Sequence, residues 1–209
     1  NKTEAMETAR GIIHKNPESP VGYVALATVY QGGNEPDKAI ETLKSSGKGK
    51  DATVALMLGN LYSLRKNHTA ALEQYRKAEA ARPGSDQILF QKANVLHAMG
   101  RKKEAEAEYE KVLRLAPGNA LALNNLAYLY AERDMRLDEA EALLKRALEI
   151  QPDSGYYLDS LGWVYFRRGD ADKAIEYIRR AIVAMDHDDA ILRDHLGDAY
   201  LMKGDVKRA

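Results

Sequence analysis

The residue types that bind metals are concentrated near the C-terminal end of the chain. Residues 186–189 read Asp-His-Asp-Asp, and Asp194 and His195 follow shortly after. A hydrolytic metal centre needs several ligands that converge from separate rigid elements, with further hydrogen bonds behind them. Here the first group lies in a predicted connection and the second in the first turns of a predicted helix, where the helix dipole favours acidic residues. We therefore predict that these side chains cap the helix and face solvent, and we expect no metal site.

Other patterns for catalysis are weak or missing in the sequence. Residues 47–50 read Gly-Lys-Gly-Lys, but a phosphate loop needs a Gly, four residues and then Gly-Lys-Ser/Thr between a strand and a helix. The chain has no cysteine, which excludes disulfides and a thiol nucleophile, and no nucleophile elbow or HExxH motif. Paired carboxylates such as Glu104 and Glu108 lie one turn apart on one helix face, not across a cleft. We expect no catalytic residues, no cofactor and no enzymatic activity.

Composition narrows the classes of partner. The chain has 209 residues, of which 31 are basic and 31 acidic, so it lacks the basic excess of a general nucleic-acid binder. Its charges are dispersed among many hydrophobic residues, unlike those of a disordered tail. No apolar run approaches the roughly 20 residues that cross a bilayer. We expect no nucleic-acid partner and no direct membrane insertion.

An internal repeat organises the chain. Three prolines, Pro83, Pro117 and Pro152, lie 34 and 35 residues apart. Six alanines recur every 32 to 35 residues, and twelve or thirteen residues before each is a small residue: Ala27, Gly59, Ala93, Ala127, Gly162 and Gly197. Three residues after each small residue is a large one: Tyr30, Tyr62, Leu96, Tyr130, Tyr165 and Tyr200. Six registers that agree at several kinds of position establish a period of about three dozen residues.

Each period predicts two helices. Apolar residues recur at helical spacing in two stretches per period, as at Leu123, Leu126 and Tyr130 in one of them. Glycines between the two stretches indicate left-handed turns at helix ends, and the prolines indicate where second helices stop. The small residues let paired helices approach closely, and the large residue fills the space beside them. One helix pair cannot bury its own apolar face, so we expect neighbouring pairs to stack.

These residues resemble the tetratricopeptide repeat, whose signature has a large residue, Leu-Gly, Tyr, then Ala, a bulky residue and Pro. The clearest copy is Leu158, Leu161, Gly162, Tyr165, Ala174, Ile178 and Ala181. The resemblance covers the whole chain and implies an all-α, right-handed superhelical solenoid of helix-turn-helix repeats. We predict a single array with half repeats at 1–19 and 190–209 and full repeats at 20–51, 52–85, 86–119, 120–154 and 155–189. Because both ends are half repeats, we expect a piece of a longer array, or an array whose flanks are disordered.

A stack of helix pairs leaves an inner, concave surface lined by the first helix of each pair. Taking the large residues after the small ones as buried, we predict that the other side of each first helix faces a partner. The predicted partner-binding residues are Asn60, Phe90, Asn94, Asn124, Tyr128, Tyr156, Asp159, Trp163, Phe166, Asp194 and Asp198.

Three kinds of side chain in this groove point to binding. Tyr128, Tyr156, Trp163 and Phe166 form a predicted aromatic cluster typical of peptide or helix anchors, or else Trp163 wedges between adjacent repeats. The recurring asparagines either pair with the backbone of an extended peptide or are only solvated. The aspartates make one end of the groove acidic, which would attract a ligand with Lys or Arg.

The sequence therefore predicts a protein-interaction scaffold or adaptor that binds a peptide or helix. Some relatives in the family clamp a terminal carboxylate with Lys and then Asn one turn later, but Leu56 and Phe90 stand where those lysines would be, so such a clamp is not expected. Residues 158–170 look similar to repeats of Gram-negative bacterial proteins that are often exported or lipid-anchored, which implies a role in envelope or secretion assembly. Two alternatives stay open: the docking arm of a larger enzyme, and a structural protein that self-associates through its half-repeat ends.

Overall fold

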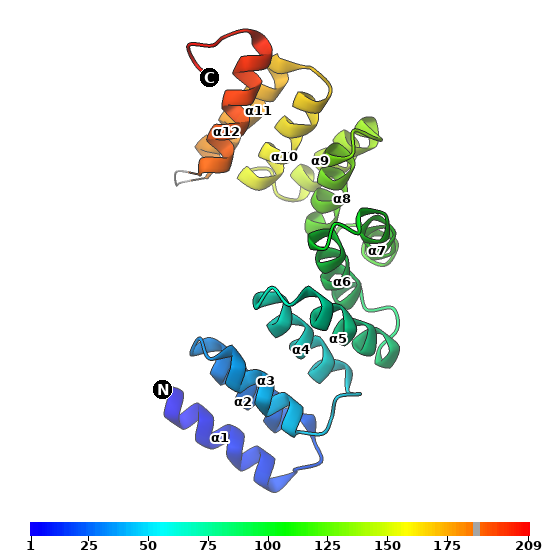
Figure 1. Cartoon of the computed structure of the whole chain (residues 1–209), viewed down its shortest axis with the longest axis vertical. Helices are drawn as coiled ribbons and strands as arrows, with labels where there is room; N and C mark the ends of the chain where they lie inside the picture. Colours follow the sequence, from blue (N-terminus) through cyan, green and yellow to red (C-terminus); the bar gives the residue numbers. More distant parts are fainter. Residues whose placement is uncertain (186–188) are drawn as a thin grey trace. The chain divides into compact units, whose positions relative to one another are not determined.

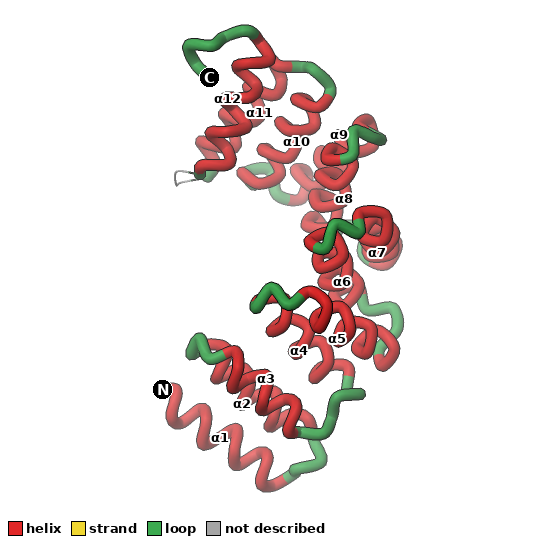
Figure 2. The backbone as a smooth tube through the Cα atoms, viewed as in Figure 1, coloured by secondary structure: helices red, strands yellow, loops and turns green. Residues whose placement is uncertain are grey.

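The computed structural model describes residues 1–185 and 189–209, and within these ranges the chain consists of α-helices and their connections, with no strand. The twelve described helices are α1 (Lys2–Lys15), α2 (Pro20–Gly32), α3 (Pro36–Ser45), α4 (Ala52–Leu64), α5 (His68–Ala81), α6 (Asp86–Ala98), α7 (Lys102–Leu115), α8 (Ala120–Glu132), α9 (Leu137–Ile150), α10 (Gly155–Arg167), α11 (Ala171–Ala184) and α12 (Ala190–Lys203). Figure 2 shows the helices joined by short connections. The predicted all-α class is confirmed, and the chain is a helical repeat solenoid.

Local sequence explains where the helices begin and end. The side chain of Asp51 accepts hydrogen bonds from the amides of Thr53 and Val54 and so caps α4. Pro36 occupies the first turn of α3, where its missing N–H costs nothing. The connection from α10 to α11 contains Gly169 at φ 78°, a left-handed conformation that glycine adopts without strain. A capping side chain, a first-turn proline and a glycine in a left-handed conformation therefore mark helix ends at these positions, as the sequence predicts.

The chain divides into two compact units, residues 1–108 and 109–209, and the division falls within α7. In the first unit, α2 packs on α3, α4 on α5, and the first helices α2, α4 and α6 contact one another in order. The core there includes Ala27, Ala39, Leu43, Val54, Leu58 and Leu61.

In the second unit α10 is central, because it contacts α8, α9, α11 and α12 (Figure 1). One buried cluster joins Leu123 of α8 to Ala147 of α9 and Tyr157 of α10. Another joins Leu158 of α10 to Ala181 of α11 and Leu192 of α12. Two sides of α10 are therefore held by apolar contacts, and α10 is a fixed platform for the side chains it carries.

The small residues of the repeat are required by close helix contacts. A Cβ atom added at Gly59 would lie 2.5 Å from Cε1 of Tyr75, and one at Gly162 would lie 2.6 Å from Cγ1 of Ile178. Both distances are far below van der Waals contact, so α4 approaches α5, and α10 approaches α11, only because a side chain is missing. The predicted reason for the small residues is thereby confirmed at these two positions. Among the described helices, none combines the length and the apolar character needed to span a bilayer.

Candidate functional site

The predicted partner-binding residues of the second unit lie on three neighbouring first helices. Relative to each small residue, two positions recur: three residues before it and one after it. In α8, α10 and α12 these positions hold Asn124 and Tyr128, Asp159 and Trp163, and Asp194 and Asp198. Because α10 contacts both α8 and α12, the three pairs form one surface, which we call the candidate face together with Tyr156 and Phe166 of α10.

Aromatic rings stack at the centre of the candidate face. The ring centroid of Trp163 lies 4.9 Å from that of Phe166 with 16° between the planes, and 4.6 Å from that of His195 with 23° between the planes. Tyr156 is 66% exposed and lies two turns before Trp163 in α10, or about 10 Å along the helix. The structure therefore brings Trp163 and Phe166 together and adds His195, while Tyr156 stands at the end of the helix.

His195 links α12 to α10 through a carboxylate. Its Nδ1 atom lies 3.0 Å from Oδ1 of Asp159, and both side chains are largely buried. Burial opposes protonation of the imidazole, but the hydrogen bond and charge of Asp159, helped by Asp198 and Asp194, outweigh it and raise the pKa of His195. The pair therefore tends to be an ion pair at mildly acidic pH.

The prediction that His195 only faces solvent at a helix start is wrong. His195 lies two residues before Gly197, at the position that Ser160 occupies in α10, and Ser160 is buried. This position relative to the small residue can be read from the sequence, and it indicates that His195 faces the preceding helices. The capping prediction holds for Asp189, whose side chain accepts a hydrogen bond of 2.8 Å from the amide of Ile191.

Metal binding finds no support in the part of the chain that the structure describes. No group of three His, Asp or Glu side chains within it is arranged to hold an ion. The Asp-His-Asp stretch at 186–188, which the sequence analysis weighed as a ligand source, lies outside the described residues.

Negative charge surrounds the stacked rings. Asp194 and Asp198 are exposed on α12, and Asp159 lies beside Trp163 on α10. Burial raises the pKa of Tyr128 on α8, and the negative charges of Glu132 and Asp159 add to this rise. Arg167 lies 5.8 Å from the Trp163 ring centroid, but its Nε atom donates a 2.7 Å hydrogen bond to Asp134. That ion pair offsets the positive charge of Arg167, which leaves the face acidic.

Two polar atoms of the candidate face are shielded without a hydrogen-bond partner among the described residues. One is Nε1 of Trp163, a donor, and the other is Oδ1 of Asn124, an acceptor. The amide nitrogen of Asn124 donates to the Oδ1 atom of Asn125 over 3.1 Å. A shielded polar atom that lacks a partner costs about 1–3 kcal/mol, so both atoms would gain from a partner's main chain.

In the first unit the predicted residues are Asn60, Phe90 and Asn94, all half-buried. The Oδ1 atom of Asn60 accepts a 2.9 Å hydrogen bond from the hydroxyl group of Tyr75. Burial raises the pKa of Tyr75 to about 12, so this hydroxyl stays protonated and remains a donor. The carbonyl of Asn60 is therefore used inside the helix pair, and its amide nitrogen is the group left for a partner.

Most of the chain resembles known repeats in sequence. Sequence profiles described as tetratricopeptide repeat match residues 24–86, 87–119 and 118–185. The chain belongs to the tetratricopeptide repeat family. Repeats of this family serve as protein-interaction scaffolds, and membership of the family supports a role of that class for the chain.

Individual relatives are distant. Protein O-mannosyl-transferase TMTC1 of Homo sapiens is 30% identical over 113 residues, which cover 51% of this chain and only 13% of that protein. The solved structure of YrrB, a TPR protein with an unusual peptide-binding site, matches with a TM-score of 0.75 at 21% identity and covers 96% of this chain and all of YrrB. PilW, a widely conserved type IV pilus biogenesis factor, matches with a TM-score of 0.80 at 22% identity over 90% of this chain and 87% of PilW. At these identities the two structures show a shared fold.

Proposed function

We propose that the candidate face binds a segment of a partner protein that carries a basic side chain, and that the chain acts as an adaptor through this contact. The observation that carries the proposal is the pair of exposed carboxylates, Asp194 and Asp198, on the same helix as His195, whose ring stacks on Trp163. Carboxylates beside aromatic rings form a favourable environment for Lys and Arg, because the charge is neutralised while the side-chain stem packs on the rings.

An extended or helical segment suits the geometry. The face spans three first helices, so a ligand crossing it meets Asn124, then Trp163, then Asp198. A carbonyl of its main chain would accept from Nε1 of Trp163, and an amide would donate to Oδ1 of Asn124, once the neighbouring side chains move aside. The acidic surroundings would speed association with a basic ligand and make it sensitive to salt.

The role of Trp163 as an anchor is part of this proposal. Its ring stacks on His195 of α12, so Trp163 also holds α10 and α12 together. The anchor interpretation would then concern a part of the ring that does not contact α12. The half-exposed part of the ring would meet the partner.

The test uses a fluorescent extended peptide with arginines and a matched peptide with glutamines in their place. Fluorescence anisotropy with the full chain should show tighter binding of the arginine peptide and weakening by added salt. The double variant Asp194→Asn/Asp198→Asn should weaken binding about tenfold. The control variant Glu149→Gln/Asp153→Asn removes the same charge from another surface and should leave affinity unchanged. Equal affinity for both peptides, or an unchanged affinity in the first double variant, would refute the proposal.

A role in bacterial envelope or secretion assembly is a narrower form of the same proposal. It is supported by the likeness of residues 158–170 to repeats of exported bacterial proteins and by the fold shared with PilW. Fractionation of a bacterial host cell that encodes the chain tests it. Recovery only in the cytosol would count against this narrower form and leave the binding proposal intact.

A second candidate function is the docking arm of a larger enzyme. The observation that favours it is the similarity to part of an O-mannosyltransferase. Under this alternative the candidate face binds a segment of the enzyme's own protein substrate. The full-length gene decides the matter, since a catalytic domain beside these repeats would support the alternative and its absence would remove it.

The repeat bounds and self-association also stay proposals. Light scattering over a range of concentrations tests self-association, because association through the ends predicts an average mass that rises with protein concentration. A constant monomer mass would remove it.

A further inference from the structure

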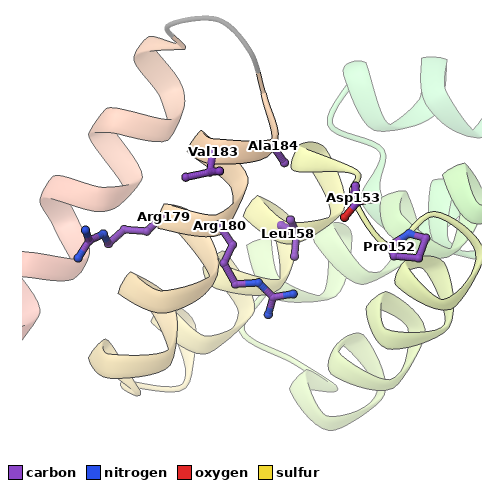
Figure 3. A pocket seen from close by; sticks show the side chains of 7 residues that line it. All are labelled: Pro152, Asp153, Leu158, Arg179, Arg180, Val183 and Ala184. Atoms are coloured by element: carbon purple, nitrogen blue, oxygen red, sulfur yellow. The ribbon is translucent and has the colours of Figure 1, made fainter.

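A second groove in residues 109–209 runs between α9 and α11, away from the candidate face. Two cavities of about 450 and 380 Å³ share Pro152 and Arg180 and therefore form one groove. Figure 3 shows Leu158 of α10 between Arg180 of α11 and the connection that carries Pro152 and Asp153. We call this the outer groove.

The outer groove has an apolar floor and helical walls. Leu158 and Leu161 of α10 form the floor and are almost fully buried. One wall is α9, with Lys145, Leu148 and Glu149, and the other is α11, with Tyr177, Arg180, Val183 and Ala184. Leu158 and Leu161 lie on a different side of α10 from Asp159 and Trp163, because successive residues turn by about 100° around a helix. A ligand in the outer groove would therefore leave Asp159 and Trp163 free.

The α11 wall combines exposed apolar and positively charged side chains. Residues 177–184 contain two arginines and no carboxylate, and Val183 is 85% exposed. The guanidinium of Arg180 lies 4.9 Å from the Tyr177 ring centroid and 3.9 Å from a carboxylate oxygen of Glu176. Arg179 is exposed and has no ion pair to a residue described in the structure. Both arginines lie before the last turn of α11. The helix dipole favours cations within that last turn, so it does not account for these two arginines.

We propose that the outer groove docks an amphipathic helical segment of a partner protein whose edge carries carboxylates. A third helix fits a groove between two helices by inserting apolar side chains, here over Leu158 and Leu161 and beside Val183. Carboxylates on its edge reach Arg180, which binds them with paired N–H donors, whereas the side chain of Arg179 extends toward α12 (Figure 3). Glu149 and Asp153 on the other side repel the acidic edge, so the segment binds with that edge toward α11.

Charge complementarity separates this surface from the candidate face. The candidate face is acidic and selects a basic segment, whereas the α11 wall is basic and selects an acidic one. Two partners of opposite charge could therefore be held by one unit at the same time, which is the work of an adaptor. The proposal about the outer groove does not depend on the one about the candidate face.

The test uses a designed peptide of about four helical turns with leucines on one face and glutamates flanking them. Its matched control has glutamine at each glutamate. Anisotropy with the full chain should show saturable binding of the glutamate peptide and at least tenfold weaker binding of the control. The variant Arg180→Gln should weaken binding of the glutamate peptide about tenfold, whereas Trp163→Ala should leave it unchanged. Circular dichroism confirms that each variant is folded.

Three results would overturn the proposal. The first is no saturable binding of the glutamate peptide to the folded chain. The second is equal affinity for the two peptides, which would show that charge plays no part. The third is weakening by Trp163→Ala and not by the arginine variant, which would move the contact to the candidate face. A milder variant, Val183→Ser, removes an exposed apolar contact without touching charge and should weaken binding several-fold.

Discussion

The imidazole of His195 on α12 lies within hydrogen-bond distance of the Asp159 carboxylate on α10, with 3.0 Å between Nδ1 and Oδ1, and its ring stacks on Trp163. One side chain thus ties the last described helix to the centre of the candidate face. The contact joins residues that are 36 positions apart. It couples the stability of this unit to pH, since one partner titrates near neutrality.

The pH dependence of this contact has a definite sign. The folded-state pKa of His195 is raised above its ordinary value of 6.5, so the folded chain holds the proton more tightly than the unfolded chain. The stabilisation is therefore complete below about 6.5 and is lost as pH rises through the folded-state pKa. We expect His195→Gln to lower the free energy of unfolding by about 1 kcal/mol more at pH 5.5 than at pH 8.5.

Urea unfolding of both proteins at the two pH values measures this difference. Asp159→Asn should reduce the pH-dependent part, because it removes the hydrogen bond and the charge that contribute most to raising the pKa of His195. A His195→Gln difference that is the same at both pH values would contradict the ion pair.

Two glycines at the same register should respond oppositely to alanine. At Gly162 a Cβ would lie 2.6 Å from Ile178, so Gly162→Ala forces α10 and α11 apart and should destabilise the chain by about 1–3 kcal/mol. At Gly197 the nearest atom is 3.9 Å from the Cβ position, so Gly197→Ala should stabilise α12 by about 0.5–1 kcal/mol through helix propensity. Thermal unfolding of the two variants distinguishes them. Equal effects would mean that close approach does not explain Gly162.

A largely buried lysine in the first unit should matter more than an exposed one. The Nζ atom of Lys92 lies 2.5 Å from a carboxylate oxygen of Glu79 and 3.1 Å from one of Glu108, and its side chain is 11% exposed. Lys92→Met leaves both carboxylates without this cation and should cost about 3 kcal/mol. Lys77→Met removes an exposed pair with Glu73 and should cost less than about 0.5 kcal/mol.

Chemical denaturation of these two lysine variants gives the comparison. The double variant Lys92→Met/Glu108→Gln should recover part of the lost stability, because it removes one of the two carboxylates that lose the Lys92 cation. No recovery would show that the methylene stem of Lys92, and not its charge, stabilises α6.

Trp163 should contribute to both stability and binding. Trp163→Ala removes stacking with Phe166 and His195 and should lower the free energy of unfolding by about 2 kcal/mol. Measured where both proteins are folded, it should also weaken the arginine peptide about tenfold. Tyr156→Ala, at an exposed position, should leave stability unchanged. If Trp163→Ala lowers the melting temperature and leaves affinity unchanged, Trp163 is a wedge only.

The sequence by itself determined the helical class and the register of the small residues. Gly59 and Gly162 could be read as close-contact positions because such contacts recur with the period, and the pattern that specifies a helix pair is local. Trp163 and Asp159 could likewise be assigned to one side of a helix, since their spacing of four residues is one turn.

Only the tertiary structure decided which of these side chains meet. The sequence predicts a solvated His195, whereas the packing of α12 on α10 places its ring against Trp163 and Asp159. The Oδ1 atom of Asn60 accepts a hydrogen bond from Tyr75, a contact that the sequence does not indicate. The outer groove likewise follows from how α9 and α11 each pack on α10. The physical reason is that periodicity specifies a position around one helix axis, whereas contact between two helices depends on their rotation and separation, which packing of the whole unit determines.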